Sequence, residues 1–289
     1  MLTLKQYIKE ADEKRSVVGH FNMSNLEGMW AIFHAAKRMK TPVIIGTSEK
    51  ERAFMGVKQC VALVRSLREE FDYPVFLNAD HTYSFEKVKE AVDAGYDAII
   101  FDGVKLQIEE NIEMTKKCVE YAKSKNADIL IEGELGYIGT SSKMYDMLPN
   151  DVRVSADVLT KPEDAERFVK ETGVDLFAPA VGNIHGMLKN SPNPDLDIDR
   201  IKAIRESTGV PIVLHGGSGT TNHDFKRAIL AGVSVIHIST EIRVAFRRSL
   251  EATLKRDSEE IAPYALMENS IFEMEKVVEE RLKVFLSKS

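Results

Sequence analysis

Eight short apolar runs, each followed by a segment with helical spacing, are the feature that most limits how this chain can fold. Runs this apolar are typical of strands buried on both faces of a parallel sheet. Eight repeated strand–helix units close into a (β/α)8 (TIM) barrel, and we therefore predict an α/β fold of this class. An open doubly wound sheet is the alternative, but no G-x-G-x-x-G motif follows the first run. The runs cover residues 17–22, 42–46, 74–79, 98–103, 129–135, 176–181, 211–216 and 235–239.

The segments between the runs repeat one design, in which a glycine ends an amphipathic helix. In FEKVKEAVDAGYD the apolar residues fall on one face, and Gly95 can stop the helix. No change of composition marks a linker, so we expect residues 1–289 to form a single domain. The barrel should occupy about 15–245, and a C-terminal extension of two charged amphipathic helices should occupy about 243–287.

Two stretches lack a regular pattern. Residues 137–160 follow the fifth run and are long enough for a lid or a binding loop. Residues 189–197 are rich in proline and asparagine, and we expect them on the surface.

Composition argues against several classes of protein. The apolar content of 44% supports a sizeable core, yet no stretch reaches the roughly 18 apolar residues of a membrane span. The N-terminus lacks the apolar centre of a signal peptide, so we expect a cytoplasmic protein without a membrane partner. A net charge of −6 disfavours general binding to nucleic acid. Cys60 and Cys118 form no C-x-x-C pair, which indicates buried thiols.

Three histidines stand at the ends of apolar runs. His81, His185 and His215 end the third, sixth and seventh runs or follow them closely. Because the carboxyl ends of barrel strands meet on one rim, these side chains should converge. Three neutral imidazoles that leave one position open are a ligand set for catalytic zinc, and their wide spacing excludes a zinc finger. Asp80, beside the first histidine, is a proton-transfer group next to the expected metal.

Acidic residues occur at the same level of the predicted barrel. Asp102, Glu132 and Glu134 could orient the imidazoles or hold an alternative metal position. A helix N-cap or a loop ion pair is the alternative interpretation for each of them.

The segment HGGSG (215–219) ends a strand and precedes a helix. Gly216 and Gly217 would let backbone N–H groups approach an anion closely. Ser239 and Thr240, at the end of the eighth run, could add hydroxyl groups. Loops after the seventh and eighth strands often hold phosphate in barrels, so we predict a phosphorylated substrate.

Together these motifs resemble the class II, zinc-dependent ketose-bisphosphate aldolases, the family of fructose- and tagatose-bisphosphate aldolases. The resemblance implies reversible cleavage of a ketose bisphosphate, first of all fructose 1,6-bisphosphate, to dihydroxyacetone phosphate and glyceraldehyde 3-phosphate. It runs from about Gly19 to Phe246 and rests on FNMSNLE, PVIIGTS, ADH, FDG followed by EENI, EGELG, GNIHGMLK, VLHGGSG and STE.

The resemblance also implies roles for individual residues. His81, His185 and His215 would hold one zinc ion per subunit, with Glu134 beside them, and Asp80 would exchange a proton with the hydroxyl at the cleaved bond. The family's C-terminal helices suggest a homodimer or homotetramer. Further positions match residues that face substrate (Asn22, Ser48), that lie in the phosphate and monovalent-cation (Na⁺ or K⁺) region (Gly182, Gly186, Gly216, Ser218, Thr240), or that end the HGxxK run (Lys189).

Cleavage of the bond beside a ketone also agrees with the residue types themselves. It leaves an enediolate whose charge a divalent metal can stabilise, while Asp80 takes the hydroxyl proton. No predicted strand end carries a lysine suited to a Schiff base, which weighs against lysine-dependent aldolases.

The chain departs from the family pattern at several positions. Thr82 replaces a second histidine, and Ser142 stands near the position of a loop glutamate that moves a proton, for which Asp146 is the candidate substitute. His237 replaces an asparagine and could hydrogen-bond substrate, reach the zinc, or serve as a core histidine.

The second phosphate is the least supported part of the substrate. Residues 265–274 contain no arginine, and the carboxylate of Glu268 lies near the position of the family's phosphate-binding arginine. Lys105 or Arg243 could compensate. The alternatives are therefore a tagatose-bisphosphate aldolase, an aldolase for a ketose 1-phosphate with a non-phosphorylated aldehyde, a metal-dependent sugar-phosphate isomerase or epimerase, and a non-catalytic sugar-phosphate sensor.

Overall fold

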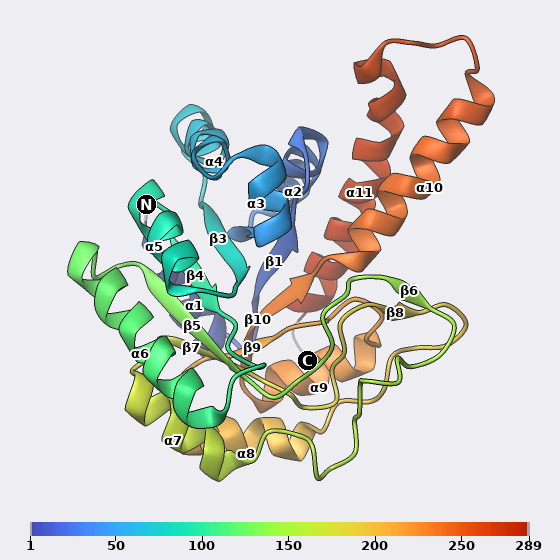
Figure 1. Cartoon of the computed structure of the whole chain (residues 1–289). Coiled ribbons are helices and arrows are strands. Elements are labelled where there is room, and N and C mark those ends of the chain that lie inside the picture. Colours follow the sequence, from blue (N-terminus) through green and yellow to red (C-terminus); the bar gives the residue numbers. More distant parts are fainter. Residues whose placement is uncertain (1, 288–289) are drawn as a thin grey trace.

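Eight parallel strands close into a barrel in the order β1-β10-β9-β7-β5-β4-β3-β2, which confirms the predicted fold class (Figure 1). The structure is a computed structural model that describes residues 2–287. Each strand overlaps one of the eight predicted runs. Their bounds are β1 (Val18–Asn22), β2 (Val43–Ser48), β3 (Val75–Thr82), β4 (Ala98–Phe101), β5 (Leu130–Leu135), β7 (Leu176–Pro179), β9 (Ile212–Leu214) and β10 (Val233–Ile238).

Helices surround the barrel and connect its strands. Glycines end four of them in the left-handed conformation, where a Cβ would be strained: Gly95 (φ 98°), Gly173 (φ 71°), Gly209 (φ 68°) and Gly232 (φ 115°). The surrounding helices are α2 (Leu26–Met39), α3 (Glu49–Met55), α4 (Val57–Phe71), α5 (Phe85–Ala94), α6 (Ile108–Lys125), α7 (Pro162–Thr172), α8 (Ile198–Thr208) and α9 (Asn222–Ala231). Cys60 and Cys118 are buried free thiols, as predicted.

The barrel interior changes from apolar to polar along the strand direction. Side chains alternate between the two faces of a strand, so Val18, His20 and Asn22 of β1 point to the same side. Val18 belongs to an interior apolar cluster to which seven other strands contribute, whereas His20 and Asn22 lie among polar groups. The chemistry-bearing side chains are therefore confined to the carboxyl end of the barrel.

Helix α1 (Leu4–Glu13) closes the amino end of the barrel. Leu4, Ile8 and Ala11 are buried and join the interior cluster of strand residues such as Phe76 and Val235. The other large cluster lies between the outer face of the strands and the surrounding helices. The helix thus supplies the apolar floor under the polar layer.

The irregular segment 137–160 contains a short strand, β6 (Met144–Tyr145), which the sequence did not predict. It pairs in parallel with β8 (Met187–Leu188), which follows β7 in the chain. Most of segment 189–197 lies on the surface, as expected, but Asn193 and Leu196 are buried. The Asn193 amide donates to the carbonyls of Gly186 and Ser218 and so joins two loops of the rim.

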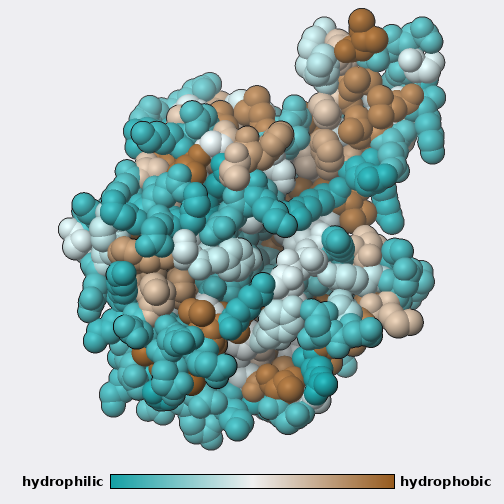
Figure 2. Space-filling view, viewed as in Figure 1, coloured by the Kyte–Doolittle hydropathy of each residue, from teal (hydrophilic) through white to brown (hydrophobic). Residues whose placement is uncertain are grey.

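The C-terminal extension is a hairpin of α10 (Thr240–Arg256) and α11 (Pro263–Leu286), which projects from the barrel (Figure 1). The lower part of α11 packs on α2 and α9. Apolar side chains gather on the projecting part (Figure 2), and Ile261, Tyr264 and Phe272 are exposed. Within residues 2–287, no helix combines the length and apolarity that a membrane span requires.

Replacing Ile8 by alanine should destabilise the barrel, because it opens a cavity where the floor is fully buried. We expect the free energy of unfolding to fall by about 2–5 kcal/mol, measured by urea denaturation. Lys9→Ala is the matched control, since Lys9 is the exposed neighbour on the same helix, and it should change stability by less than about 0.5 kcal/mol. Equal effects of the two substitutions would show that α1 does not support the interior.

Candidate metal centre and active site

An irregularity in β3 brings two adjacent side chains to one site. Neighbouring residues of a regular strand point to opposite faces, so Asp80 and His81 should diverge. His81 instead has a φ of 44°, in the left-handed region that non-glycine residues rarely adopt. The pairing of β3 with β4 shifts register between Ala79 and Thr82, as in a β-bulge. Both side chains consequently line the same cavity.

Arg52 of α3 holds this bulge in place. Its buried guanidinium donates to the carbonyl oxygen of Asp80 and to Oγ1 of Thr82, both at 3.0 Å, and also to the carbonyl of Thr47. Burial lowers the pKa of Arg52, although nearby Tyr96 and Asp80 oppose this effect. Two of these hydrogen bonds hold the residues on either side of His81, the Asp80 carbonyl and the Thr82 side chain, and such support is what a strained residue at a functional site requires.

Each of the three predicted metal-binding histidines uses one ring nitrogen to contact an outer partner. His81 Nδ1 lies 2.8 Å from Asp102 Oδ2, and His215 Nε2 lies 2.6 Å from Glu132 Oε1. His185 Nδ1 lies 2.7 Å from the carbonyl oxygen of Gly139. Because these oxygens accept hydrogen bonds, each contact holds the N–H of the neutral imidazole and leaves its other ring nitrogen with a lone pair.

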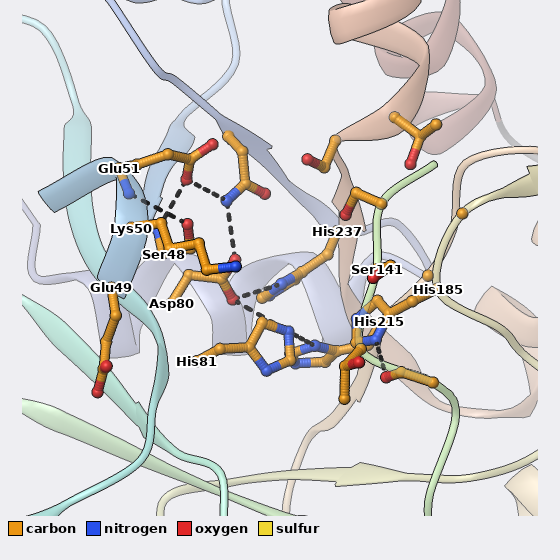
Figure 3. Close-up of a pocket in the computed structure, with 18 of the residues that line it drawn as sticks. Ser48, Glu49, Lys50, Glu51, Asp80, His81, Ser141, His185, His215 and His237 are labelled. Atoms are coloured by element: carbon orange, nitrogen blue, oxygen red, sulfur yellow. Dashed lines mark hydrogen bonds and ion pairs between the residues drawn. The ribbon is translucent and has the colours of Figure 1, made fainter. Parts of the chain in front are cut away.

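The three remaining nitrogens face one another (Figure 3). They lie within 4.8 Å of each other, and His81 Nε2 is 3.2 Å from His215 Nδ1. Lone pairs at this distance repel unless a proton or a cation lies between them. A divalent metal fits this arrangement, since metal-binding histidines donate their second N–H to a carboxylate or a backbone carbonyl.

The charges around the histidines favour a cation between them. Burial acts to lower the pKa of His81, but Asp80, Asp102 and Glu134 outweigh it and raise the pKa to about 10. Burial lowers the pKa of His185 to about 3, so this imidazole is neutral at neutral pH. The site therefore attracts either a proton or a metal ion, and metal uptake must displace the proton of His81.

The predicted carboxylates Asp102, Glu132 and Glu134 lie close to the three predicted metal-binding histidines. Burial raises the pKa of Glu134 to about 8, and its Oε2 lies 3.4 Å from His81 Nδ1. Burial also raises the pKa of Glu132, although its contact with His215 opposes the shift. Asp102, Glu132 and Glu134 thus lie where they can orient imidazoles. Other combinations of these side chains also meet the spacing of a metal site, among them His81 with Asp102 and Glu134.

Asp80 lies between the three histidines and a second set of polar side chains, Asn22 and His237. Asn22 Nδ2 donates to its Oδ2 at 2.8 Å, and His237 Nδ1 lies 3.5 Å from its Oδ1. Burial alone would raise the pKa of Asp80, but His81, His237 and His20 outweigh it and hold the pKa well below its usual range. Asp80 is therefore an ionised carboxylate with one buried oxygen, Oδ1, that has no hydrogen-bond partner within residues 2–287.

His237 stacks on His20 at the base of the cavity. Their ring centroids are 3.5 Å apart and their planes differ by 4°. Burial lowers the pKa of His20 to about 4 and that of His237 well below its usual range, so both rings are neutral. Both ring nitrogens of His20 and Nε2 of His237 have no partner among the described residues. Replacement of Gly46 would disturb this pair, because a Cβ there would lie 2.1 Å from the His20 ring.

The glycine-rich turns form another wall of the cavity. Gly216 has a φ of 61°, and a Cβ there would lie 2.1 Å from the carbonyl oxygen of Ile184, so only glycine fits. Ser218 Oγ accepts from the backbone N–H groups of Ser239 and Glu241, at the start of α10. Ser239 Oγ is buried and lacks a partner within the described chain. Gly216, Ser218, Ser239 and Thr240 all line the cavity, as do Gly186, Asn22 and Ser48.

Four predicted residues lie elsewhere. Asp146 is exposed and pairs with Lys189 at 2.9 Å, and neither lines the cavity, because the β6–β8 pairing turns both outward. Gly217 donates its N–H to the carbonyl of His237, so it is not free for an anion. Gly182 (φ 101°) makes a tight turn against the Asp195 carbonyl, away from the cavity.

The cavity, of about 730 Å³, also contains residues that the sequence did not indicate. Loop residues from Gly139 to Lys143 cover one side, in line with the expectation of a lid or binding loop. Lys105 and Arg243, considered as compensating cations, both line the cavity. The unpredicted members outside this loop are Ser24, Glu49, Lys50, Glu51, Phe54 and Tyr83, with His20 buried beneath.

Comparisons with known proteins agree with this geometry. The sequence model of the family described as fructose-bisphosphate aldolase class-II matches residues 2–289. A fructose-bisphosphate aldolase of Geobacillus stearothermophilus is 37% identical over 260 residues, which cover 89% of this chain and 87% of the relative. One from Staphylococcus aureus (strain Mu50) is 33% identical and covers 99% and 97%. The solved structure of the YdjI aldolase from Escherichia coli K12 has a TM-score of 0.82 at 28% identity, with 99% and 98% covered. The chain therefore belongs to the class II fructose-bisphosphate aldolase family.

Proposed function

We propose that the chain is a zinc-dependent lyase that cleaves fructose 1,6-bisphosphate to dihydroxyacetone phosphate and glyceraldehyde 3-phosphate, and catalyses the reverse condensation. The observation that carries this proposal is the convergence of three imidazoles, each held by an outer partner, next to an ionised Asp80. Family membership and the relatives' names support the reaction type.

One zinc ion per subunit would be held by His81, His185 and His215. When bound, it would supply a Lewis acid that stabilises negative charge on the substrate's ketone oxygen. Class II membership and the histidine cluster support this metal. The reaction then needs a base for the hydroxyl next to the cleaved bond.

Asp80 is the base that the cavity provides. Its carboxylate is ionised, and its Oδ1 has no hydrogen-bond partner within the described residues, so it can take the hydroxyl proton and return it in the condensation. Asn22 donates to Oδ2 and fixes the orientation of the carboxylate. No step requires Asp146, since it lies outside the cavity.

The glycine-rich turns would hold the phosphate that remains on dihydroxyacetone. Gly216 and Ser218 bring a loop close to the start of α10, where Ser239 and Thr240 line the cavity wall. Helix starts of this kind favour anions. A sodium or potassium ion near these turns forms part of the proposal, with the unpartnered Ser239 hydroxyl as a candidate ligand.

A cytoplasmic homodimer or homotetramer completes the proposed function. Exposed Ile261, Tyr264 and Phe272 on the projecting hairpin are an apolar surface that a second copy of the chain could cover. The partner in the reaction is a small sugar phosphate.

Replacing His215 by alanine should abolish both zinc binding and cleavage, because it removes one of three metal ligands. Zinc content would be measured by mass spectrometry, and cleavage of fructose 1,6-bisphosphate by a coupled reductase that consumes dihydroxyacetone phosphate. The matched control, His223→Ala, changes an exposed histidine and should retain both.

Two results would contradict this proposal. Full activity of the wild type in rigorously metal-free buffer would exclude a metal-dependent reaction. Conversion of substrate without any three-carbon phosphate would instead identify an isomerase or epimerase on the same site.

Replacing Asp80 by asparagine should lower kcat by about 10²–10⁴-fold, the usual contribution of a positioned base. Zinc content should stay near one per subunit, since Asp80 is not among the three proposed ligands. Loss of zinc together with activity would show that Asp80 acts on the metal site and not as the base.

Replacing both Ile261 and Tyr264 by glutamate should shift the protein toward monomer, because it places charge on the proposed contact surface. Light scattering coupled to gel filtration measures the change. A wild type that is monomeric at micromolar concentration would exclude the proposed assembly.

A further inference from the structure

Glu51 is a buried carboxylate inside the cavity that no step of the proposed reaction uses. It occupies the first turn of α3, where Ser48 and Glu51 form a capping box. The side chain also reaches beyond the helix. Its Oε1 accepts from Ser24 Oγ at 2.8 Å and from Arg243 Nη2 at 2.6 Å.

The other carboxylate oxygen of Glu51 accepts hydrogen bonds from two donors that could otherwise bind substrate. Glu51 Oε2 lies 2.7 Å from the backbone N of Ser48 and 3.3 Å from Asn22 Nδ2. The same Asn22 amide donates to Asp80 at 2.8 Å. The N–H groups of Asn22 and Ser48 on this side of the cavity are therefore committed to carboxylates.

This side of the cavity should receive the end of the sugar that leaves as the aldehyde. The phosphate of the dihydroxyacetone half would occupy the glycine-rich turns after β9 and β10, and Asp80 marks the cleaved bond. An extended ketose then continues past Asp80 toward the ends of β1 and β2. Figure 3 shows Glu51 on the far side of Asp80 from His185 and His215.

We propose that Glu51 sets the specificity for the aldehyde half, so that the enzyme also cleaves ketose 1-phosphates whose distal end is an uncharged, hydroxylated chain. The inference rests on the proposed function and extends its substrate range. A carboxylate accepts hydrogen bonds from sugar hydroxyls, whereas a second phosphate beside it meets a like charge. Asn22 and Ser48 are uncharged donors on this side of the cavity, and both already donate to Glu51.

The remaining cations compensate only weakly. Lys50, Lys105 and Lys143 line the cavity mouth, are exposed, and form no ion pair within residues 2–287. An exposed lysine contact of this kind raises affinity by less than about fivefold. Arg243 is already paired with Glu51. A ketose bisphosphate can therefore bind with its second phosphate near these lysines, but its kcat/KM should exceed that of a ketose 1-phosphate only slightly.

The test compares kcat/KM for fructose 1,6-bisphosphate and fructose 1-phosphate in the zinc-loaded enzyme. For the wild type we expect a ratio below about tenfold, because only exposed lysines favour the second phosphate. Glu51→Gln and Glu51→Ala should each raise the ratio by about tenfold or more, since they remove the like charge and free Arg243. Glutamine also retains the capping box.

Glu49→Gln is the matched control. Glu49 belongs to the same helical turn and also lines the cavity, but its carboxylate accepts from the Tyr83 N–H and points away from Asp80 (Figure 3). Removing this charge should change the ratio by less than about threefold, because a partly exposed charge is screened by solvent.

A wild-type preference for the bisphosphate above about a hundredfold would overturn the inference even if both Glu51 variants failed to fold. So would Glu51 variants whose ratio matches that of Glu49→Gln. If either result is obtained while the wild type still cleaves fructose 1,6-bisphosphate, the inference about Glu51 fails but the proposed aldolase function stands. Cleavage of neither substrate would overturn both.

Discussion

The left-handed conformation of His81 is the constraint on which the active site depends. A regular β3 would present either Asp80 or His81 to the cavity, and the proposed metal ligand and proton-transfer group could not share one side of the strand. The bulge allows both, and the buried Arg52 holds it through the Asp80 carbonyl and the Thr82 hydroxyl. Arg52 thus lies outside the proposed metal site, yet it helps to hold both the proposed ligand His81 and the proposed base Asp80 in position. The strained backbone of His81 lies where the chemistry requires it.

The environment of each titratable group follows from its depth in the barrel. The apolar floor supplied by α1 and the strand interiors lies directly beneath His20 and His237, and it keeps these rings neutral. Higher in the barrel, carboxylates gather around His81 and favour a positive charge there. Along the length of single strands, the barrel interior therefore changes from an apolar region that excludes charge to a polar region that attracts a cation.

The sequence predicted the barrel and the convergence of His81, His185 and His215 because both follow from strand periodicity and from the shared direction of parallel strands. It did not predict where Asp146 and Lys189 lie, since a two-residue pairing of β6 with β8 turns them outward and leaves no periodic signal. Glu51 was missed for a different reason. Ser48 and Glu51 form a capping-box pattern, and this local role gave no sign of the contacts to Asn22 and Arg243.

The pairing of β1 with β10 joins the first and last strands of the barrel. While the chain is being synthesised, β1 keeps an open edge until about 215 further residues have emerged, since β10 begins at Val233 and β1 at Val18. The floor helix α1 likewise packs against β10, and α11 covers α2. The amino-terminal third must therefore wait for the carboxyl-terminal third before its exposed edge is protected. Any delay in translation of the last hundred or so residues would prolong the period in which that edge can pair with other chains.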